Sequence, residues 1–351
     1  MMNAYIHVPF CRKKCAYCAF YSLPAADRDM VERYLNKITA ELRDCPHRFS
    51  TVYLGGGTPT LLEERDLERI FSILRTEPGA EISIEANPET LTPAKLAMLA
   101  NYANRLSIGV QSFSEEKRRK LGRDCSDKAI RAALDCTAFP HRNLDLMYAV
   151  PGDTADAFRQ DLRLAITSGV DHISCYSLTP EEQTAFAGTV IDEDASADLW
   201  KLAGDTLGEA GIFRYEVSNY ARPGAECRHN VNVWRGEKLL GFGPAAASFD
   251  GEQRYSQIAS IPRWLAGDPP EWDRIPADAR RREIFAVNLR TVAGWQKKEF
   301  LSLPGATETE WQNFLQILQT FPPSFTALAP EQIRLTESGL LFWDAIASEL
   351  L

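Results

Sequence analysis

Short apolar runs alternate with longer segments of helical periodicity over about the first 215 residues of the chain. The short runs are rich in branched and aromatic residues, which is typical of buried strands. The predicted strands are Tyr5–Phe10, Thr51–Leu54, Glu81–Ala86, Arg105–Gln111, Asn143–Val150 and His172–Leu178. Between them, apolar residues recur at intervals of three and four, which predicts amphipathic helices. These helices are Arg28–Arg43, Leu61–Arg75, Pro93–Ala100, Ser126–Thr137, Ala155–Ser168 and Ala195–Glu209.

Strands that alternate with helices in this way predict a parallel sheet joined by right-handed crossovers. Six such units in order favour a curved, partly open barrel, two units short of a full (β/α)8 barrel. The expected fold class is therefore α/β, with an incomplete (β/α)6 barrel over residues 1–215.

The pattern changes after the sixth unit. Residues 216–270 are expected to form an irregular connecting segment, in which Leu239–Phe249 carries little side-chain volume and Pro269-Pro270 marks a surface linker. Residues 271–351 are expected to form a smaller, mainly helical domain. Its predicted elements are helices over Arg280–Arg290, Glu308–Gln319 and Glu337–Leu350 and a short strand at Ile333–Thr336. This order resembles a winged-helix-like module.

Composition and charge exclude several classes of protein. Hydrophobic residues make up 45% of the chain and charged residues 25%, an ordinary globular balance. The formal net charge of -9 argues against nucleic-acid binding through electrostatics. No run approaches the 18 or so apolar residues of a membrane-spanning helix, and the chain starts without a signal or transit segment. We therefore expect a cytoplasmic protein.

Three of the eight cysteines lie close together, as Cys11, Cys15 and Cys18 in the spacing C-x3-C-x2-C. A tight loop of this kind can present three thiolates to one metal centre and leave a fourth position open. It predicts a [4Fe–4S] cluster with one iron free to bind a small ligand. Structural zinc would need a second pair of ligands, and disulfides are disfavoured without a secretory signal. Five further cysteines lie scattered at positions 45, 125, 136, 175 and 227, and most of them are interpreted as small buried hydrophobes.

Glycine and polar residues follow the predicted strands at positions that suit a ligand. Gly55-Gly56-Gly57-Thr58-Pro59 comes directly after the second strand, where glycines expose backbone groups and allow close approach. The run is not a dinucleotide fingerprint, because G-x-G-x-x-G is absent. Glu85 and Gln111 lie at or near strand ends, and Asp145 interrupts an apolar run. In parallel α/β folds functional groups gather at the carboxyl ends of strands, so these residues predict a ligand-lined cavity.

The cysteine loop after Tyr-Ile-His-Val-Pro-Phe, with the glycine turn one unit on, resembles the radical S-adenosylmethionine (SAM) superfamily. It is most similar to the branch of the oxygen-independent coproporphyrinogen III dehydrogenases (HemN) and the haem chaperones (HemW). The resemblance runs over nearly the whole chain. It implies that Cys11, Cys15 and Cys18 hold three irons of a [4Fe–4S] cluster and that the fourth iron binds SAM. It further implies SAM contacts at Tyr5, Gly56, Gly57, Thr58, Glu85, Gln111, Arg123 and Asp145.

Two features separate the branches. The dehydrogenases carry a further cysteine where this chain has Phe20, and an N-terminal extension, whereas here Tyr5 lies almost at the start. The chaperones carry a haem-linked His-Asn-x-x-Tyr-Trp motif, to which His229-Asn230-Val231-Asn232-Val233-Trp234 is similar, with Val233 in place of the tyrosine. The resemblance implies a haem-contacting loop with His229 as an iron ligand, and Cys227 as the competing one.

The expected function is that of a HemW-like chaperone that binds haem and delivers it to haem proteins. The alternatives are a coproporphyrinogen III dehydrogenase acting through a 5'-deoxyadenosyl radical, and a degenerate SAM-binding protein that recruits partners. No catalytic residue is assigned; reductive SAM cleavage is left open and porphyrinogen dehydrogenase activity is not expected. The expected partners are haem-accepting proteins and an electron donor such as a flavodoxin or ferredoxin. Nucleic acid is excluded, and a peripheral membrane contact is left open.

Overall fold

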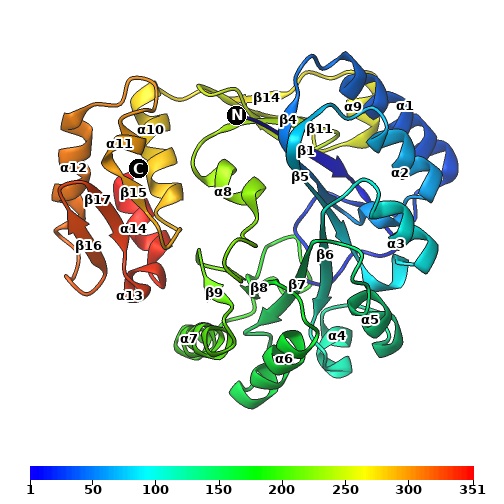
Figure 1. The fold of residues 1–351 in the computed structure, drawn as a ribbon, viewed down its shortest axis with the longest axis horizontal. Helices are drawn as coiled ribbons and strands as arrows, with labels where there is room; N and C mark the ends of the chain where they lie inside the picture. Colours follow the sequence, from blue (N-terminus) through cyan, green and yellow to red (C-terminus); the bar gives the residue numbers. More distant parts are fainter.

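The computed structural model describes residues 1–351, and its largest element is a twelve-stranded sheet. Six strands of this sheet are parallel neighbours in chain order, which confirms the predicted α/β class. They are β1 (Met2–Val8), β4 (Phe49–Gly56), β5 (Thr76–Ala86), β6 (Arg105–Gln111), β7 (His141–Tyr148) and β8 (His172–Ser177). The sheet is curved but does not close into a barrel (Figure 1).

Four of the six helices between these strands lie within two residues of their predicted bounds. The helix predicted over Leu61–Arg75 covers only Glu64–Phe71, and the one predicted over Ser126–Thr137 covers Asp127–Leu134. The six helices are α1 (Arg28–Asp44), α2 (Glu64–Phe71), α3 (Pro93–Leu99), α5 (Asp127–Leu134), α6 (Ala155–Thr167) and α7 (Glu193–Glu209). Side chains such as Asp27, Thr92 and Ser126 accept a hydrogen bond from the first turn and fix where each helix starts. One further helix, α4 (Glu115–Lys120), is almost entirely charged and has no apolar periodicity that would predict it.

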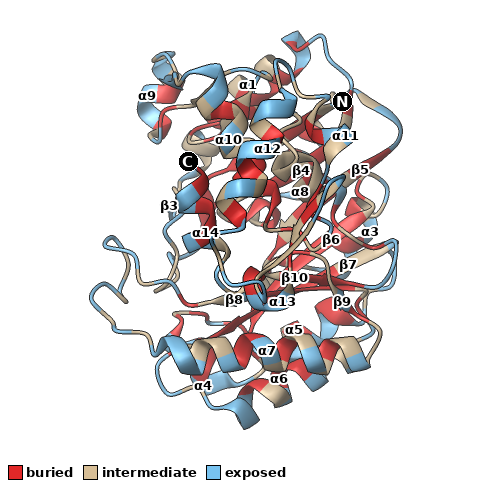
Figure 2. Ribbon diagram, turned by 90° about the vertical axis from the view of Figure 1, so that its left-hand side faces the viewer, coloured by how far each residue is buried: buried red, intermediate tan, exposed pale blue.

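The two faces of the parallel sheet differ in chemistry because successive side chains of a strand point to opposite faces. One face is apolar: Val52 and Leu54 of β4 enter the main core, which the helices cover (Figure 2). The other face is polar, and its side chains bond to one another across the strands. Its members include Asn3, Tyr5, Thr51, Tyr53, Glu81, Glu85, Asn143, Asp145, His172 and Ser174. The sheet therefore presents a polar inner surface above an apolar layer.

The segment 216–270 carries short elements where an irregular connection is expected. These are β10 (Asn219–Ala221), α8 (Arg228–Trp234), β11 (Lys238–Phe242), β12 (Ala247–Phe249), β13 (Arg254–Ser256) and α9 (Ile261–Ala266). Strand β11 lies parallel to β1, so the chain returns to the edge where the sheet began. The edge strands β14 (Glu271–Asp273) and β9 (Phe213–Arg214) complete the sheet. Strands of two to five residues give little periodic signal.

The C-terminal region is mainly helical, as predicted, with a small antiparallel sheet. Its helices are α10 (Ala277–Asn288), α11 (Lys297–Phe300), α12 (Glu308–Leu318), α13 (Glu337–Leu340) and α14 (Trp343–Leu350). Its strands are β15 (Trp295–Gln296), β16 (Thr326–Ala329) and β17 (Gln332–Leu335). Phe285 stacks on Phe314 with ring centroids 3.8 Å apart at the centre of an aromatic cluster. The domain boundaries at 215 and 270 stay a prediction.

Arg290 joins this region to the sheet, because its guanidinium bonds the buried carboxylate of Glu216 at 2.7 Å. None of the helices combines the length and the apolar character that crossing a lipid bilayer requires.

Candidate functional site

A cavity of about 440 Å³ opens at the carboxyl ends of the parallel strands. Seven of the eight residues predicted to contact SAM line it: Gly56, Gly57, Thr58, Glu85, Gln111, Arg123 and Asp145. The three cysteines of the loop, Cys11, Cys15 and Cys18, line it as well. Residues that are far apart in the sequence therefore meet in one space, as the strand-end argument predicts.

The cysteine loop is held in place by main-chain bonds. Cys11 belongs to the short strand β2 (Phe10–Cys11), which pairs with β3 (Leu23–Pro24). Inside the loop, the Ala16 amide donates to the Leu121 carbonyl at 3.0 Å. The three thiols do not converge on one point as a single-ion site would require. A [4Fe–4S] cluster binds each thiolate through a different iron, so three soft donors along one cavity wall fit it.

The glycine turn is tied to the strand that carries Cys11. The amides of Gly57 and Thr58 donate to the carbonyls of Val8 and Phe10, both at 2.8 Å. A Cβ at Gly57 would lie 2.6 Å from the Phe10 oxygen, and Gly56 has a φ of +111°. The close approach that Gly57 allows is therefore to the protein's own backbone, and it joins the SAM-side turn to the cysteine loop.

Two half-buried carboxylates face the cavity. Glu85 accepts hydrogen bonds from the Tyr53 hydroxyl at 3.0 Å and the Gly56 amide at 3.1 Å, and Asp145 accepts one from Asn143 at 2.7 Å. Burial, together with the charge of Asp145, raises the pKa of Glu85 to about 7, and burial raises the pKa of Asp145 to about 6. Two carboxylates that destabilise each other's charge favour a cationic ligand between them.

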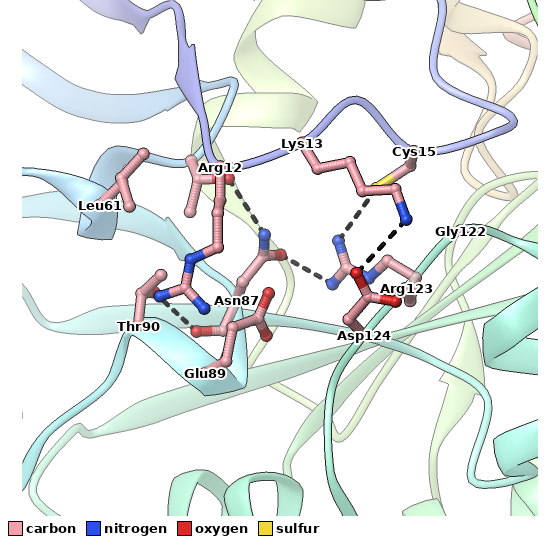
Figure 3. Close-up of a pocket in the computed structure, with 11 residues that line it drawn as sticks. Arg12, Lys13, Cys15, Leu61, Asn87, Glu89, Thr90, Gly122, Arg123 and Asp124 are labelled. Carbon is pink, nitrogen blue, oxygen red and sulfur yellow. Dashed lines mark hydrogen bonds and ion pairs between the residues drawn. The ribbon is translucent and has the colours of Figure 1, made fainter. Parts of the chain in front are cut away.

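Arg123 supplies the positive side of the site (Figure 3). Its guanidinium donates to Asn87 Oδ1 at 2.7 Å and to the Gly109 carbonyl, and it lies 3.6 Å from Cys15 Sγ. Its Nε is buried with no hydrogen-bond partner in the protein. Because Arg123 lines the cavity beside the cysteines, its positive charge suits a carboxylate-bearing ligand there.

Tyr5 is the one predicted SAM residue that does not line the cavity. Its hydroxyl lies 3.0 Å from His7 Nδ1, and its ring stacks on Tyr53 with centroids 6.3 Å apart. Tyr5 therefore supports Tyr53, which in turn bonds Glu85. Sequence reasoning missed Tyr53 and Asn143, although both are two residues from a strand-end residue and share its face by the period of two.

His229 lies in helix α8, where a loop is expected. The ring is buried: Nδ1 lies 2.8 Å from Thr51 Oγ1, and the ring centroid lies 5.2 Å from that of Tyr53. The Thr51 hydroxyl donates its hydrogen bond to Asn3 Oδ1, so it can only accept one from His229. The proton of the neutral His229 ring is therefore on Nδ1, and Nε2 keeps a free lone pair. Burial lowers the pKa of His229 to about 4, which keeps the imidazole neutral. This tautomer is the one that can bind iron through Nε2.

Trp234 of the predicted haem motif and the competing ligand Cys227 lie away from the His229 ring. Trp234 follows His229 by five residues, about 140° around the helix. Its ring lies 6.2 Å from that of Tyr215 and 4.8 Å from the Arg290 guanidinium. Cys227 is buried at the start of α8, with its Sγ 3.6 Å from Glu81 Oε1. A flat ligand that touches both the imidazole and the indole would thus require α8 to turn or move.

Comparison with known proteins gives a consistent picture. Residues 5–165 match the model of the Radical SAM superfamily. The chain is 34% identical to the "Heme chaperone HemW" of Mycobacterium tuberculosis, over 99% of this chain and 94% of that protein. It is 32% identical to the "Heme chaperone HemW" of Escherichia coli, over 98% and 97% of the two chains.

Among solved structures, the chain matches the one described as "Coproporphyrinogen III oxidase (HemN) from Escherichia coli is a Radical SAM enzyme". The TM-score is 0.84 and the identity 21%, over 99% of this chain and 89% of the other. At this identity the match establishes a shared fold.

Proposed function

Because the chain belongs to the radical SAM superfamily and, within it, to the family of HemW haem chaperones, we propose that it binds haem and delivers it to haem proteins. The observation that carries this proposal is the similarity to the chaperones over nearly the full length of both chains. Phe20, in the position of the dehydrogenases' additional cysteine, points the same way. Haem titration of the reconstituted protein, beside an assay of porphyrinogen decarboxylation, tests the proposal.

Membership of the superfamily brings a [4Fe–4S] cluster and SAM, and this pair supplies reductive cleavage of SAM to methionine and a 5'-deoxyadenosyl radical. In our proposal Cys11, Cys15 and Cys18 are the cluster's protein ligands. Arg123, whose guanidinium lines the cavity, takes the carboxylate of SAM. The carboxylates of Glu85 and Asp145, which line the same cavity, take its ammonium group or ribose hydroxyls.

For haem, we propose His229 as the iron ligand, with Cys227 as the competing candidate. The neutral imidazole with a free Nε2 lone pair supports His229, whereas burial and the neighbouring Glu81 raise the pKa of the Cys227 thiol to about 12 and disfavour its thiolate. Because His229 is only 5% exposed, helix α8 has to shift before iron can reach Nε2.

The proposed partners are haem-accepting proteins and a one-electron donor such as a flavodoxin or ferredoxin. The donor would approach the exposed run Arg12-Lys13-Lys14, which lies within the cysteine loop. We also propose a cytoplasmic location, since a cluster of this kind is assembled in a reducing compartment. A peripheral contact with a membrane stays a prediction.

Replacing either Arg123 or Asp145 by alanine should weaken SAM binding and leave the cluster intact. Neither residue is a proposed iron ligand, and each loses one charge-assisted contact. Such a loss costs about 1.5–3 kcal/mol, or roughly 10- to 100-fold in affinity. Equilibrium dialysis with reconstituted protein measures the effect, and Lys128→Ala on the exposed face of α5 is the matched control. Wild-type SAM affinity in both variants would remove these residues from the site.

A further inference from the structure

A chain of buried and partly buried hydrogen bonds runs from the cavity to the start of helix α8. Asn143 donates to Asp145 at 2.7 Å, and the Asn143 carbonyl oxygen lies 2.6 Å from His172 Nδ1. His172 Nε2 lies 2.8 Å from the Tyr215 hydroxyl. The Tyr215 oxygen then accepts the amide of Cys227, the N-terminal cap of α8, at a longer 3.4 Å. One continuous path therefore links a cavity carboxylate to the helix that carries His229.

This path has a single polarity as long as Asp145 is ionised. A carboxylate only accepts, so the Asn143 amide group faces it and its carbonyl faces His172. His172 must then donate from Nδ1, and the neutral ring leaves Nε2 as an acceptor for the Tyr215 hydroxyl. Burial lowers the pKa of His172 far below its usual value, so the ring stays neutral. Because the Tyr215 hydroxyl donates its hydrogen bond to His172 Nε2, the lone pairs of its oxygen are free to accept the Cys227 amide.

A second link runs through Tyr53. Its hydroxyl donates to Glu85 at 3.0 Å, and its ring lies against the imidazole of His229, with centroids 5.2 Å apart. The Glu85 carboxylate therefore holds the ring that covers His229. Both acidic groups of the cavity are thus connected to α8, one through its first residues and the other through its histidine.

We infer that ligand binding in the cavity is coupled to helix α8, such that bound SAM holds α8 against β4 and weakens haem binding at His229. The inference rests on the proposed function, because it takes SAM as the cavity ligand and His229 as the haem contact. Tyr53 and Tyr215 act in it as positioning residues, since neither is assigned a contact with SAM or haem.

The direction of the coupling follows from charge and burial. A cation between Glu85 and Asp145 keeps both ionised, and ionised carboxylates are the stronger acceptors for Tyr53 and Asn143. Both links are then at their strongest, and α8 stays in the arrangement in which His229 is buried. Haem iron needs the opposite, because Nε2 is reached only when α8 moves away from β4. The two ligands therefore favour different positions of one helix.

Hydrogen–deuterium exchange tests the coupling without haem. In anaerobically reconstituted protein, saturating SAM should slow exchange of the amides of residues 227–231 about fivefold or more. The double variant Tyr53→Phe/Tyr215→Phe keeps both rings and loses both hydroxyls, so SAM should no longer protect α8. Tyr102→Phe is the matched control, since Tyr102 stacks on Phe71 away from the cavity. If the double variant does not fold, the exchange of the two single variants is measured instead.

Absence of protection in the wild type, at SAM concentrations where dialysis shows binding, would overturn the inference. Protection that persists in variants lacking the hydroxyls would overturn it too.

A haem titration then tests the direction of the effect. Saturating SAM should raise the Kd for haem about fivefold or more, and haem should raise the Kd for SAM by the same factor, because coupling is reciprocal. Equal or tighter haem binding with SAM would contradict the antagonism. If haem does not bind at all, the proposed function fails, whereas the exchange result still decides the coupling between the cavity and α8.

Discussion

Replacing Cys11, Cys15 and Cys18 together by alanine is expected to abolish cluster assembly. Anaerobically reconstituted wild-type protein should hold about four irons and show the brown colour of a [4Fe–4S] cluster. The triple variant should hold none, because these thiols are the soft donors along the cavity wall. The loop itself should remain folded, since its anchors, such as the Ala16–Leu121 and Cys11–Ala25 bonds, are main-chain groups. Iron analysis and the visible spectrum measure the effect, with far-ultraviolet circular dichroism as the check on folding.

The matched controls for this variant are Cys45→Ala and Cys136→Ala. Cys45 caps the end of α1 and Cys136 follows α5, and neither lines the cavity. Each control should keep its iron and its colour. Assembly of the cluster in the triple variant would refute the assignment of the ligands.

Replacing His229 by alanine is expected to remove or strongly alter haem binding. The imidazole is proposed as the iron ligand, and its loss should shift the Soret band or lower haem occupancy. The cluster should be unaffected, because the His229 ring on α8 packs against Thr51 and Tyr53 of β4 and does not line the cavity. An absorbance titration measures haem binding, and iron analysis of the same preparation measures the cluster content.

His47→Ala is the matched control, since His47 is exposed and would report only adventitious binding of haem to surface histidines. Its titration should equal that of the wild type. If His229→Ala is silent and Cys227→Ala is not, the thiolate is the ligand. If both are silent while haem still binds, the site lies outside the start of α8.

Much of the fold follows from local pattern. The six parallel strands and their crossover helices carry enough pattern to be predicted in order, although β5 starts five residues before the predicted strand and α2 is shorter than its predicted helix. The strand β11 is a different case, because Lys238–Phe242 is only five residues long and pairs with β1 across more than two hundred residues of sequence. Helix α8 was expected as a loop, since seven residues with mixed polarity carry no helical signal.

The residues of the site also differ in how far the sequence predicts them. Glu85, Gln111 and Asp145 were predicted to share a cavity because strand ends meet at one edge, and they do line one cavity. The layer beneath, with Tyr53, Asn143 and His172, was not foreseen. These side chains are buried and polar, and their importance depends on cross-strand neighbours that only the register of the sheet reveals. Tyr5 lies in that layer as well, behind Tyr53.

The measurement that tests the central claim most directly is a pair of assays on one anaerobically reconstituted preparation. One assay follows haem transfer to an acceptor, and the other follows decarboxylation of coproporphyrinogen. The protein should bind haem, pass it to an apo-haem protein such as apomyoglobin, as the acceptor's Soret band records, and release no carbon dioxide from coproporphyrinogen. Turnover of coproporphyrinogen by a sample that neither binds nor transfers haem would contradict the account and identify a dehydrogenase.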